Sequence, residues 1–469
     1  MNKRFFSFFL CLLLTLSLAS AHVSAVSVTQ TAKTAVWVTW QTPSPRIAST
    51  GGEWSVLGVY RSGADAPAGY DDCYAAEVEQ QLAACSGQLS RQKYTEYSRV
   101  ILALTAIGRD PSDFGGYNLL LPLGDYEATV RQGVNGAVFA LLALDGGAYT
   151  IPQNAQATTQ ATRERYVQHI LDRECAGGGF SVSGGAPDAD VTAMALTALA
   201  NYAEQPEVAA AVSRGVSRLS AMQMADGSFA SGGISNCEST AQVLIALSTL
   251  GVSVSDVRFL KNGNSAEAGL LQFSAEDGGF SHTKGGIAGV MATEQALCAL
   301  AALSRAQSGQ PGFYDMSDVR TAVFRDVVGH PCQLAIETLA EKGILGGMGD
   351  GTFAPEATMT RAQFAAVLAR SLDLNSGTSS GFSDVPAGAW YADSVNAASA
   401  AGLISGVGNH QFQPQGEVTV RAAERILNRA AAFCGLSGVS AGPMTDGRPI
   451  SRGELAQKLY LFLEKAGRL

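Results

Sequence analysis

The sequence predicts an all-α protein. We expect an α6/α6 toroid over residues 28–306, in which six inner helices lie inside six outer ones, followed by small helical modules. Two kinds of repeat predict this fold. In the first two-thirds, the glycine-aromatic turns "GGGF" (177–180), "DGSF" (226–229) and "DGGF" (277–280) recur about every 50 residues, the period of a helical-hairpin repeat. In the last third, residues 324–372 and 382–431 align from end to end.

The first 21 residues have the pattern of a secretory signal peptide. The basic start "MNKR" precedes the apolar run "FFSFFLCLLLTLSLA" and the small-residue cleavage site "ASA" at 19–21. No later run reaches the roughly 18 apolar residues of a membrane span. We therefore predict a secreted protein without a transmembrane segment after signal cleavage.

The net charge and the cysteine pattern exclude two classes of protein: nucleic-acid-binding proteins and proteins held together by a disulfide framework. The formal net charge is −9, which makes nucleic acid an unsuitable partner because its binding depends on basic residues that neutralise phosphates. The cysteines left after signal cleavage are odd in number and lack paired short spacings. A disulfide framework is therefore not expected.

Each glycine-aromatic turn precedes a segment rich in Ala and Leu, such as "DVTAMALTALA" from Asp190, and weaker copies occur upstream. These segments are apolar on nearly every face, which is typical of enclosed helices. The segments between them, such as "RERYVQHILDRE", carry charge on one side and predict the outer layer. The six inner helices are expected to begin at or near Glu53, Glu96, Asn135, Asp190, Glu238 and Glu294.

The turns "QMADGSF" and "QFSAEDGGF" resemble the Gln…Gly…Trp turns of terpene cyclases, with Phe in place of Trp. On these turns, residues 28–306 are similar to the prenyltransferase and squalene oxidase repeat superfamily. The resemblance implies a terpenoid cyclase-like α/α toroid with a central cavity. It says little about activity, because one fold hosts many functions.

Aligning the inner helices by their Ala-Leu pairs places polar residues at a common starting position, with Glu96 one place out of register. Carboxylates there gain about 0.3 to 1 kcal/mol from the helix macrodipole, so capping alone explains them. The functional interpretation is a mouth that binds a small molecule, glycan or peptide. Its candidate residues are Glu53, Trp54, Glu96, Tyr97, Arg99, Asn135, Asp190, Glu238 and Glu294.

An enzyme is the alternative. Asp190 in "DADVTA" resembles the catalytic acid of class II terpene cyclases, but the second Asp of that motif is Val191 here. Cys237 and His282 lack the context of the prenyltransferase zinc site, so we expect neither a metal nor a cofactor. We predict a binding module rather than an enzyme. A degenerate cyclase-like enzyme with Asp190 as general acid, and a purely structural surface-layer component, stay open.

The last third resembles S-layer homology modules. Each copy has an opening "F-x-D-V", a helix, a glycine turn, an "F-x-P" piece and a second helix. We predict a linker at 307–321, modules at 322–374 and 382–436, and a partial third module at 437–469. The resemblance implies attachment to an anionic secondary cell-wall polysaccharide and a location at the cell wall or S-layer surface.

Two sites within these modules are expected to bind the glycan. In "MTRAQ" and "ISRGE", a capping hydroxyl precedes an arginine, so a guanidinium and free backbone N–H groups converge on one anion site. The middle module has Val420 at the arginine position, which puts its site in doubt. The candidate glycan contacts are Thr360, Arg361, Trp390, Ser451 and Arg452.

Overall fold

The computed structural model describes the chain outside residues 1–27, 320–322, 325, 349–350, 375–380 and 437–441. The predicted signal peptide lies outside the described residues. The chain divides into two compact units, Met1–Thr321 and Ala322–Leu469. Each unit is described by itself.

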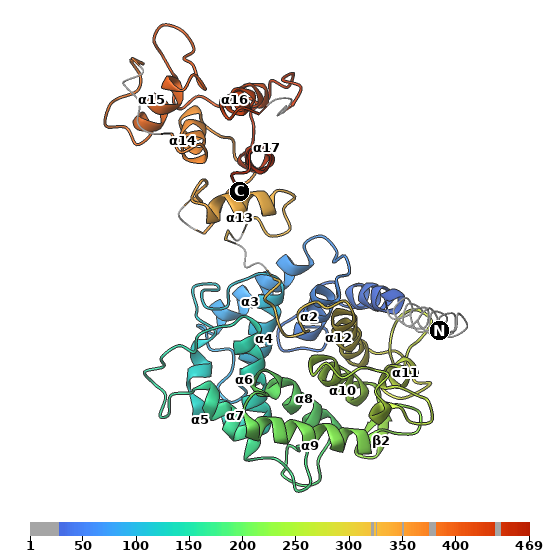
Figure 1. Ribbon diagram of the computed structural model, residues 1–469. Coiled ribbons are helices and arrows are strands. Elements are labelled where there is room, and N and C mark those ends of the chain that lie inside the picture. The colour runs from blue at the N-terminus through green and yellow to red at the C-terminus, as the bar shows by residue number, and fades with distance from the viewer. Residues whose placement is uncertain (1–27, 320–322, 325, 349–350, 375–380, 437–441) are drawn as a thin grey trace, which may run out of the picture. The chain divides into compact units, whose positions relative to one another are not determined.

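The first unit is a closed double ring of helices, which confirms the predicted fold class (Figure 1). Each inner helix packs against the next, and the last packs back on the first. The inner helices are α2 (Glu53–Ser62), α4 (Thr95–Ala106), α6 (Val134–Gly146), α8 (Ala189–Leu199), α10 (Cys237–Thr249) and α12 (Val290–Gln307). The outer ones are the helix over 28–41, α3 (Tyr70–Ala84), α5 (Tyr126–Thr129), α7 (Arg163–Leu171), α9 (Pro206–Met222) and α11 (Ala266–Leu271).

Burial separates the two layers as the hydrophobic patterns predict. Inner helices are buried on almost every side, because neighbours on both flanks and the outer layer enclose them. Outer helix α9 instead buries one face, through Val208, Ala211, Val216 and Leu219 at helical spacing. Between these helices, the described residues include one hairpin of β1 (Phe229–Ser231) and β2 (Ile234–Asn236).

The glycine-aromatic turns fix the start of three inner helices through one repeated hydrogen bond. The backbone N–H of Phe229 donates to Thr240 Oγ1 at 3.0 Å. The pairs Phe180–Thr192 and Phe280–Thr293 repeat this bond at 2.9 and 2.8 Å. The turns need glycine: at Gly227 (φ +87°), a Cβ would lie 2.2 Å from the Ser265 carbonyl oxygen.

The predicted linker over 307–321 is wrong for most of its length. Arg61, at the end of α2, donates to the carbonyls of Gly312, Phe313 and Asp315. It also forms an ion pair of 2.8 Å with Asp318. Phe313 is 1% exposed, so this segment packs on the ring where the inner helices end. The physical reason is that Arg61 and its neighbour Arg305 are buried and require carbonyl and carboxylate partners.

The second unit consists of three lobes related by an approximate threefold repeat of backbone bonds. Three extended pieces close a ring of backbone bonds: Met359 donates to Ile450, Ile450 to Val418, and Val418 to Met359, at 3.2, 2.8 and 2.9 Å. Helix α13 packs on α17 and α15 packs on α14, so the modules exchange helices. The helices are α13 (Gln333–Glu341), α14 (Arg361–Ser371), α15 (Ala392–Ala400), α16 (Val420–Phe433) and α17 (Arg452–Lys465).

The third lobe lacks the aspartate that accepts a backbone hydrogen bond in the other two lobes, and a glutamate from another helix takes its place. In the complete modules, Asp326 accepts from Phe353 N–H and Asp384 from Phe412 N–H, both at 2.7 Å. These acids come from the "F-x-D-V" openings, which the third module lacks. There Glu424 of α16, 2% exposed, accepts from Met444 N–H at 2.7 Å and pairs with Lys458. A shortened module can therefore still complete the threefold arrangement of lobes.

Candidate functional site

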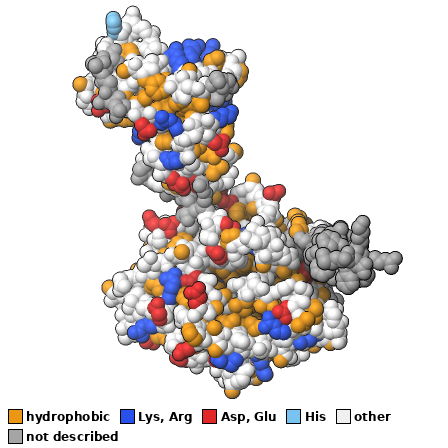
Figure 2. Space-filling model, in the orientation of Figure 1, with side chains coloured by type: hydrophobic (Ala, Val, Ile, Leu, Met, Phe, Trp, Pro, Cys, Tyr) orange, Lys and Arg blue, Asp and Glu red, His pale blue; other side chains and the backbone are white. Residues whose placement is uncertain are grey.

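On three inner helices of the first unit, one line of partly exposed side chains faces the interior of the ring. In α6, α8 and α10, the partly exposed residues of the first two turns stand four positions apart: Asn135 and Phe139, Asp190 and Met194, Glu238 and Gln242. The other faces are packed against neighbours, so these stripes face the interior of the ring. Figure 2 shows hydrophobic side chains gathered toward the middle of one face of this unit.

Aromatic side chains meet across the interior. The rings of Trp54 and Phe139 have centroids 5.9 Å apart. Their helices, α2 and α6, are separated by α4 around the ring, so this contact crosses the hollow.

The carboxyl of Asp190 titrates far from its ordinary range. Burial raises the pKa of Asp190 to about 6; the Ser239 hydroxyl opposes this, and the nearby charges of Asp188 and Glu238 add to it. Asp188, rather than Asp190, caps α8, by accepting from the backbone N–H groups of Asp190 and Val191. Asp190 is therefore not needed for capping.

In the first turns of the neighbouring helices α6, α8 and α10, some buried polar atoms have no hydrogen-bond partner among the described residues. They are Asn135 Oδ1, Asp190 Oδ1 and Ser239 Oγ. Buried polar atoms in folded proteins are normally paired with protein, water or ligand. The cluster can therefore accept hydrogen bonds from a bound molecule or from ordered water.

Glu53 and Glu294 do not belong to this cluster, which corrects the predicted acidic ring. Both are 2% exposed. Glu53 Oε1 accepts from the Ala48 N–H at 2.6 Å, and Glu294 Oε2 accepts from the Ser55 hydroxyl at 2.8 Å. These acids join α2 to its neighbours in the wall of the ring.

The alignment by Ala-Leu pairs is the cause of this error. The hydrogen bonds from the phenylalanine turns make Thr192, Thr240 and Thr293 equivalent. Asp190 and Glu238 precede these threonines by two residues, whereas Glu294 follows Thr293. Glu294 is thus displaced by nearly one helical turn.

Tyr97, Glu96 and Arg99 also lie differently from the prediction. Tyr97 is 3% exposed and packs against Tyr94, so it is a core residue. Glu96 precedes the buried Ser98 by two residues, just as Asp190 precedes Thr192 by two. Glu96 nevertheless lines a separate pocket. Arg99 lies close enough to Glu53 and Glu294 to influence the pKa of both.

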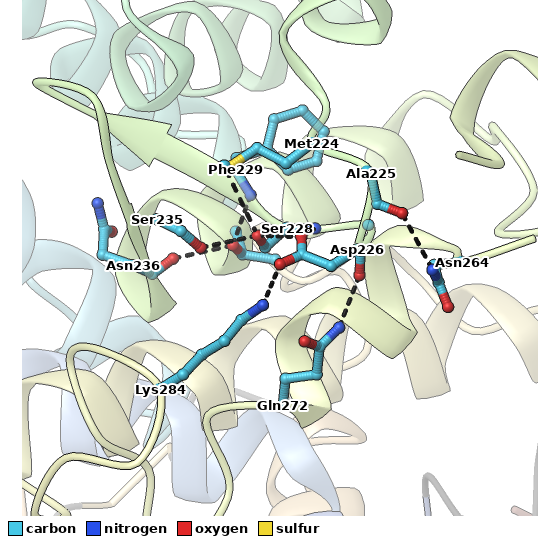
Figure 3. A network of polar contacts seen from close by, with 12 residues as sticks. Met224, Ala225, Asp226, Ser228, Phe229, Ser235, Asn236, Asn264, Gln272 and Lys284 are labelled. Carbon is cyan, nitrogen blue, oxygen red and sulfur yellow. Dashed lines mark hydrogen bonds and ion pairs between the residues drawn. The ribbon is translucent and has the colours of Figure 1, made fainter. Parts of the chain in front are cut away.

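Polar bonds between successive repeats were missed by the sequence analysis. Ser231 donates to Asp188 Oδ2 at 2.8 Å, and His282 Nδ1 lies 2.7 Å from Glu238 Oε2. Figure 3 shows Lys284 reaching Asp226 in the preceding turn. In each case a loop before one inner helix bonds the previous repeat. The repeated "GG" in the loops at 184–185, 232–233 and 285–286 is the sequence signal that could have indicated equivalent loops.

Arginine stacking defines a second candidate site, in the second unit. The Arg361 guanidinium lies 4.5 Å from the centroid of the Phe412 ring, and it donates to the Phe412 and Ser405 carbonyls at 2.7 and 2.9 Å. Arg452 repeats this geometry 4.4 Å from Phe353. Both arginines are held rigidly at the first position of their helices.

The backbone N–H groups beside these arginines are not free, contrary to the prediction. Arg361 N–H donates to the Gly416 carbonyl, and the next amide donates to Pro414. Thr360 accepts from Gln363 N–H and forms a capping box. Ser451 caps α17 in the same way. At both helix starts, therefore, side chains and not backbone amides are available to an anion.

A pocket of about 190 Å³ surrounds the Arg361 site. It brings Arg361 together with Arg425 and Arg429 of α16, and no carboxylate occurs among its described lining residues. Burial lowers the pKa of Arg361, yet its guanidinium stays charged at any ordinary pH. Trp390 is 67% exposed, stacks edge-on against Tyr391, and does not line this pocket.

The remaining lobe lacks the parts of such a site. Val420, 3% exposed, holds the helix position of Arg361 and Arg452. Met444 stands where the other lobes have a phenylalanine, since its N–H takes the equivalent bond to a carboxylate. The structure therefore contains two arginine-phenylalanine sites in the described part of this unit.

These features define the class of protein: a helical toroid followed by small helical modules, two of which carry an arginine stacked on a phenylalanine. Residues 323–365 and 381–419 match the S-layer homology domain family. The second unit therefore contains S-layer homology domains, and the protein belongs at the cell surface. In the described part of the chain, no helix is long and apolar enough to cross a membrane, and no group of three acidic, His or Cys side chains could hold a metal ion.

Curated relatives share short stretches with this chain. An amylopullulanase of Thermoanaerobacterium thermosulfurigenes is 39% identical over 23% of this chain and 6% of its own length. An exoglucanase of Acetivibrio thermocellus is 35% identical over 24% of this chain and 10% of its own length. A surface layer protein of Brevibacillus choshinensis is 28% identical over 33% of this chain and 14% of its own length. The chain thus spans only a small part of these relatives.

Among solved structures, an unsaturated glucuronyl hydrolase from Bacillus sp. GL1 is similar with 12% identity and a TM-score of 0.39, covering 62% of this chain and 98% of that one. The narrower resemblance of the toroid to prenyltransferases and terpene cyclases stays a prediction.

Proposed function

We propose that the second unit anchors the protein non-covalently to an anionic secondary polysaccharide of the cell wall. The observation that carries this proposal is the pocket in which Arg361, Arg425 and Arg429 meet without a carboxylate. A fixed guanidinium fork binds carboxylate-bearing sugars through paired hydrogen bonds. Arg452 repeats the stacked arginine geometry on another lobe, so a second contact with the same polymer chain is proposed there.

Sedimentation of the full-length protein with purified cell walls tests the anchor. We expect Arg361→Ala combined with Arg452→Ala to weaken binding by more than roughly tenfold, and each single variant to weaken it less. Arg421→Ala is the matched control, because Arg421 is exposed and lies outside the pocket. Equal sedimentation of the double variant and the control would exclude the arginine sites as the anchor.

We also propose that the toroid binds a ligand at the end of the ring where Asp190 lies. Support comes from the unpaired atoms of Asn135, Asp190 and Ser239 beside the aromatic interior. Two of these atoms are acceptor oxygens, so they favour a small molecule, glycan or peptide rich in O–H or N–H donors. Binding rather than catalysis is the proposed role.

Two other roles remain as alternatives for the toroid. The raised pKa of Asp190, about 6, would suit a general acid, and the enzyme alternative requires turnover that Asp190→Asn abolishes. A purely structural surface component would bind no ligand and would assemble through its surface. Thermal-shift screening of the full chain with wall glycans and small ligands separates ligand binding from a purely structural role, because a bound ligand raises the melting temperature with its concentration. Turnover that Asp190→Asn abolishes separates an enzyme from a binding module.

A further inference from the structure

A separate pocket of about 400 Å³ lies beside the first turn of α4. Its volume falls within the range of about 300 to 1,000 Å³ that is typical of small-molecule sites. Three segments build it: the loop before α2, the outer helix α3, and the start of α4. Its lining residues are Arg46, Ile47, Ala48, Ser49, Glu77, Gln81, Cys85, Leu89 and Glu96.

The lining combines acceptors with an apolar wall. Glu77 and Glu96 contribute carboxylates, and Ile47 and Leu89 contribute aliphatic surface. Arg46 is the one basic residue among these described lining residues. Its Nε lies 3.9 Å from Glu77, and its side chain is 76% exposed. Such a long and exposed ion pair stabilises little, so a better placed cation can displace it.

Two buried side chains near this pocket, Glu53 and Tyr74, each have one polar atom that makes no hydrogen bond within the described part of the chain. Glu53 is 2% exposed and Tyr74 is fully buried, yet Glu53 Oε2 and the Tyr74 hydroxyl make no hydrogen bond among the described residues. Both adjoin the pocket wall: Glu53 Oε1 accepts from Ala48 N–H, and Glu77 is close enough to influence the pKa of Tyr74. Glu53 is also close enough to raise the pKa of Tyr74, and Glu96 to raise the pKa of Glu53, so acidic groups gather on this side of the ring.

We propose that this pocket binds an organic cation, namely a primary amine or guanidinium carried on a short aliphatic stem. The cationic head lies between Glu77 and Glu96, and the stem contacts Ile47 and Leu89. Arg46 occupies the site in the free protein as an internal competitor. The same chemistry is present in a free diamine and in a Lys or Arg side chain of a peptide. This pocket is separate from the arginine sites of the second unit and from the cluster of Asn135, Asp190 and Ser239.

Isothermal titration of the full-length protein tests the proposal with four probes: cadaverine, pentanediol, glutarate and the blocked tripeptide Gly-Lys-Gly. We expect saturable binding of cadaverine but not of the neutral diol or the dianion. If the tripeptide binds more tightly than cadaverine, the natural source is a peptide side chain; if it binds less tightly, the source is a free amine.

Charge variants give opposite predictions for this site. The double variant Glu77→Gln and Glu96→Gln should weaken cadaverine binding by roughly tenfold or more. Arg46→Ala should tighten it, because the competitor is removed. Glu204→Gln, at an exposed position after α8, is the matched control and should leave the affinity unchanged. Unchanged melting curves verify folding.

Three results would overturn the proposal: equal binding of pentanediol or glutarate, weaker amine binding by Arg46→Ala, or no saturable amine binding up to ~10 mM.

Discussion

Glu294 in the last inner helix accepts a hydrogen bond from the Ser55 hydroxyl in the first, at 2.8 Å. The same carboxylate oxygen accepts from the Gly51 backbone N–H at 3.0 Å. A buried acid therefore links α12 to α2 where the two ends of the toroid's sequence meet. At the other end of this junction, Arg61 and Arg305 share Asp318.

This link predicts that the stability of the toroid depends on pH. Burial raises the pKa of Glu294 from 4.5 to about 7, although Ser55 and Gly51 oppose the shift. Between those values the folded protein holds a proton that the unfolded chain releases. The Glu294 contribution to the unfolding free energy is therefore present below pH 4.5 and is lost as the pH rises through 7, by on the order of 3 kcal/mol.

Urea unfolding of wild type and Glu294→Gln across this range measures the effect. The variant cannot ionise at this position, so its stability should fall less with rising pH. The difference between the two profiles isolates Glu294 from Asp190 and Glu53, which also titrate. Glu276→Gln, at an exposed position, is the control. Parallel profiles for wild type and Glu294→Gln would contradict the prediction.

The repeated turn bond predicts a loss of stability in Thr240→Val. Valine preserves the shape of threonine but leaves the buried Phe229 N–H without an acceptor. An unsatisfied buried donor costs about 1 to 3 kcal/mol. Thr249→Val is the comparison, because the Thr249 hydroxyl bonds a carbonyl of its own helix. Chemical denaturation should show the larger loss for Thr240→Val; equal losses would mean that the turn bond is unimportant.

The third lobe depends on Glu424. Glu424→Ala removes the acceptor of Met444 N–H and one charged partner of Lys458. Losing a hydrogen bond to a charged group costs about 1.5 to 3 kcal/mol. Hydrogen exchange of the full chain should show faster exchange at 442–465 in the variant, while the exposed control Asp393→Ala exchanges as wild type does. Unchanged exchange would show that the pair does not hold this lobe.

The variant Arg361→Lys tests whether wall binding requires the stacked geometry of the guanidinium or only its positive charge. Lysine keeps the positive charge but cannot stack flat on Phe412 while donating to both carbonyls. We expect wall binding to fall nearly as far as in Arg361→Ala. If Arg361→Lys binds walls as the wild type does, simple charge attraction accounts for the site and the stacked geometry is unnecessary.

Much of the architecture could be predicted from local patterns. The spacing of Phe180, Phe229 and Phe280 predicted the helical repeats, and the aligned modules predicted two arginine sites with Val420 as the exception. The errors concern the direction of side chains. One position along a helix rotates a side chain by about 100°. An alignment error of a few residues was therefore enough to predict Glu294 at the mouth of the ring, whereas the structure places it in the wall.

The sequence by itself determined which segments form helices, where turns require glycine, and which residues begin each module. These properties depend on interactions within a few residues. The tertiary structure decided that Glu294 bonds the neighbouring helix α2, that backbone amides beside Arg361 are already satisfied, and that Glu424 replaces a missing aspartate. Each of these depends on contacts between segments distant in the chain, which form only when the ring and the threefold close.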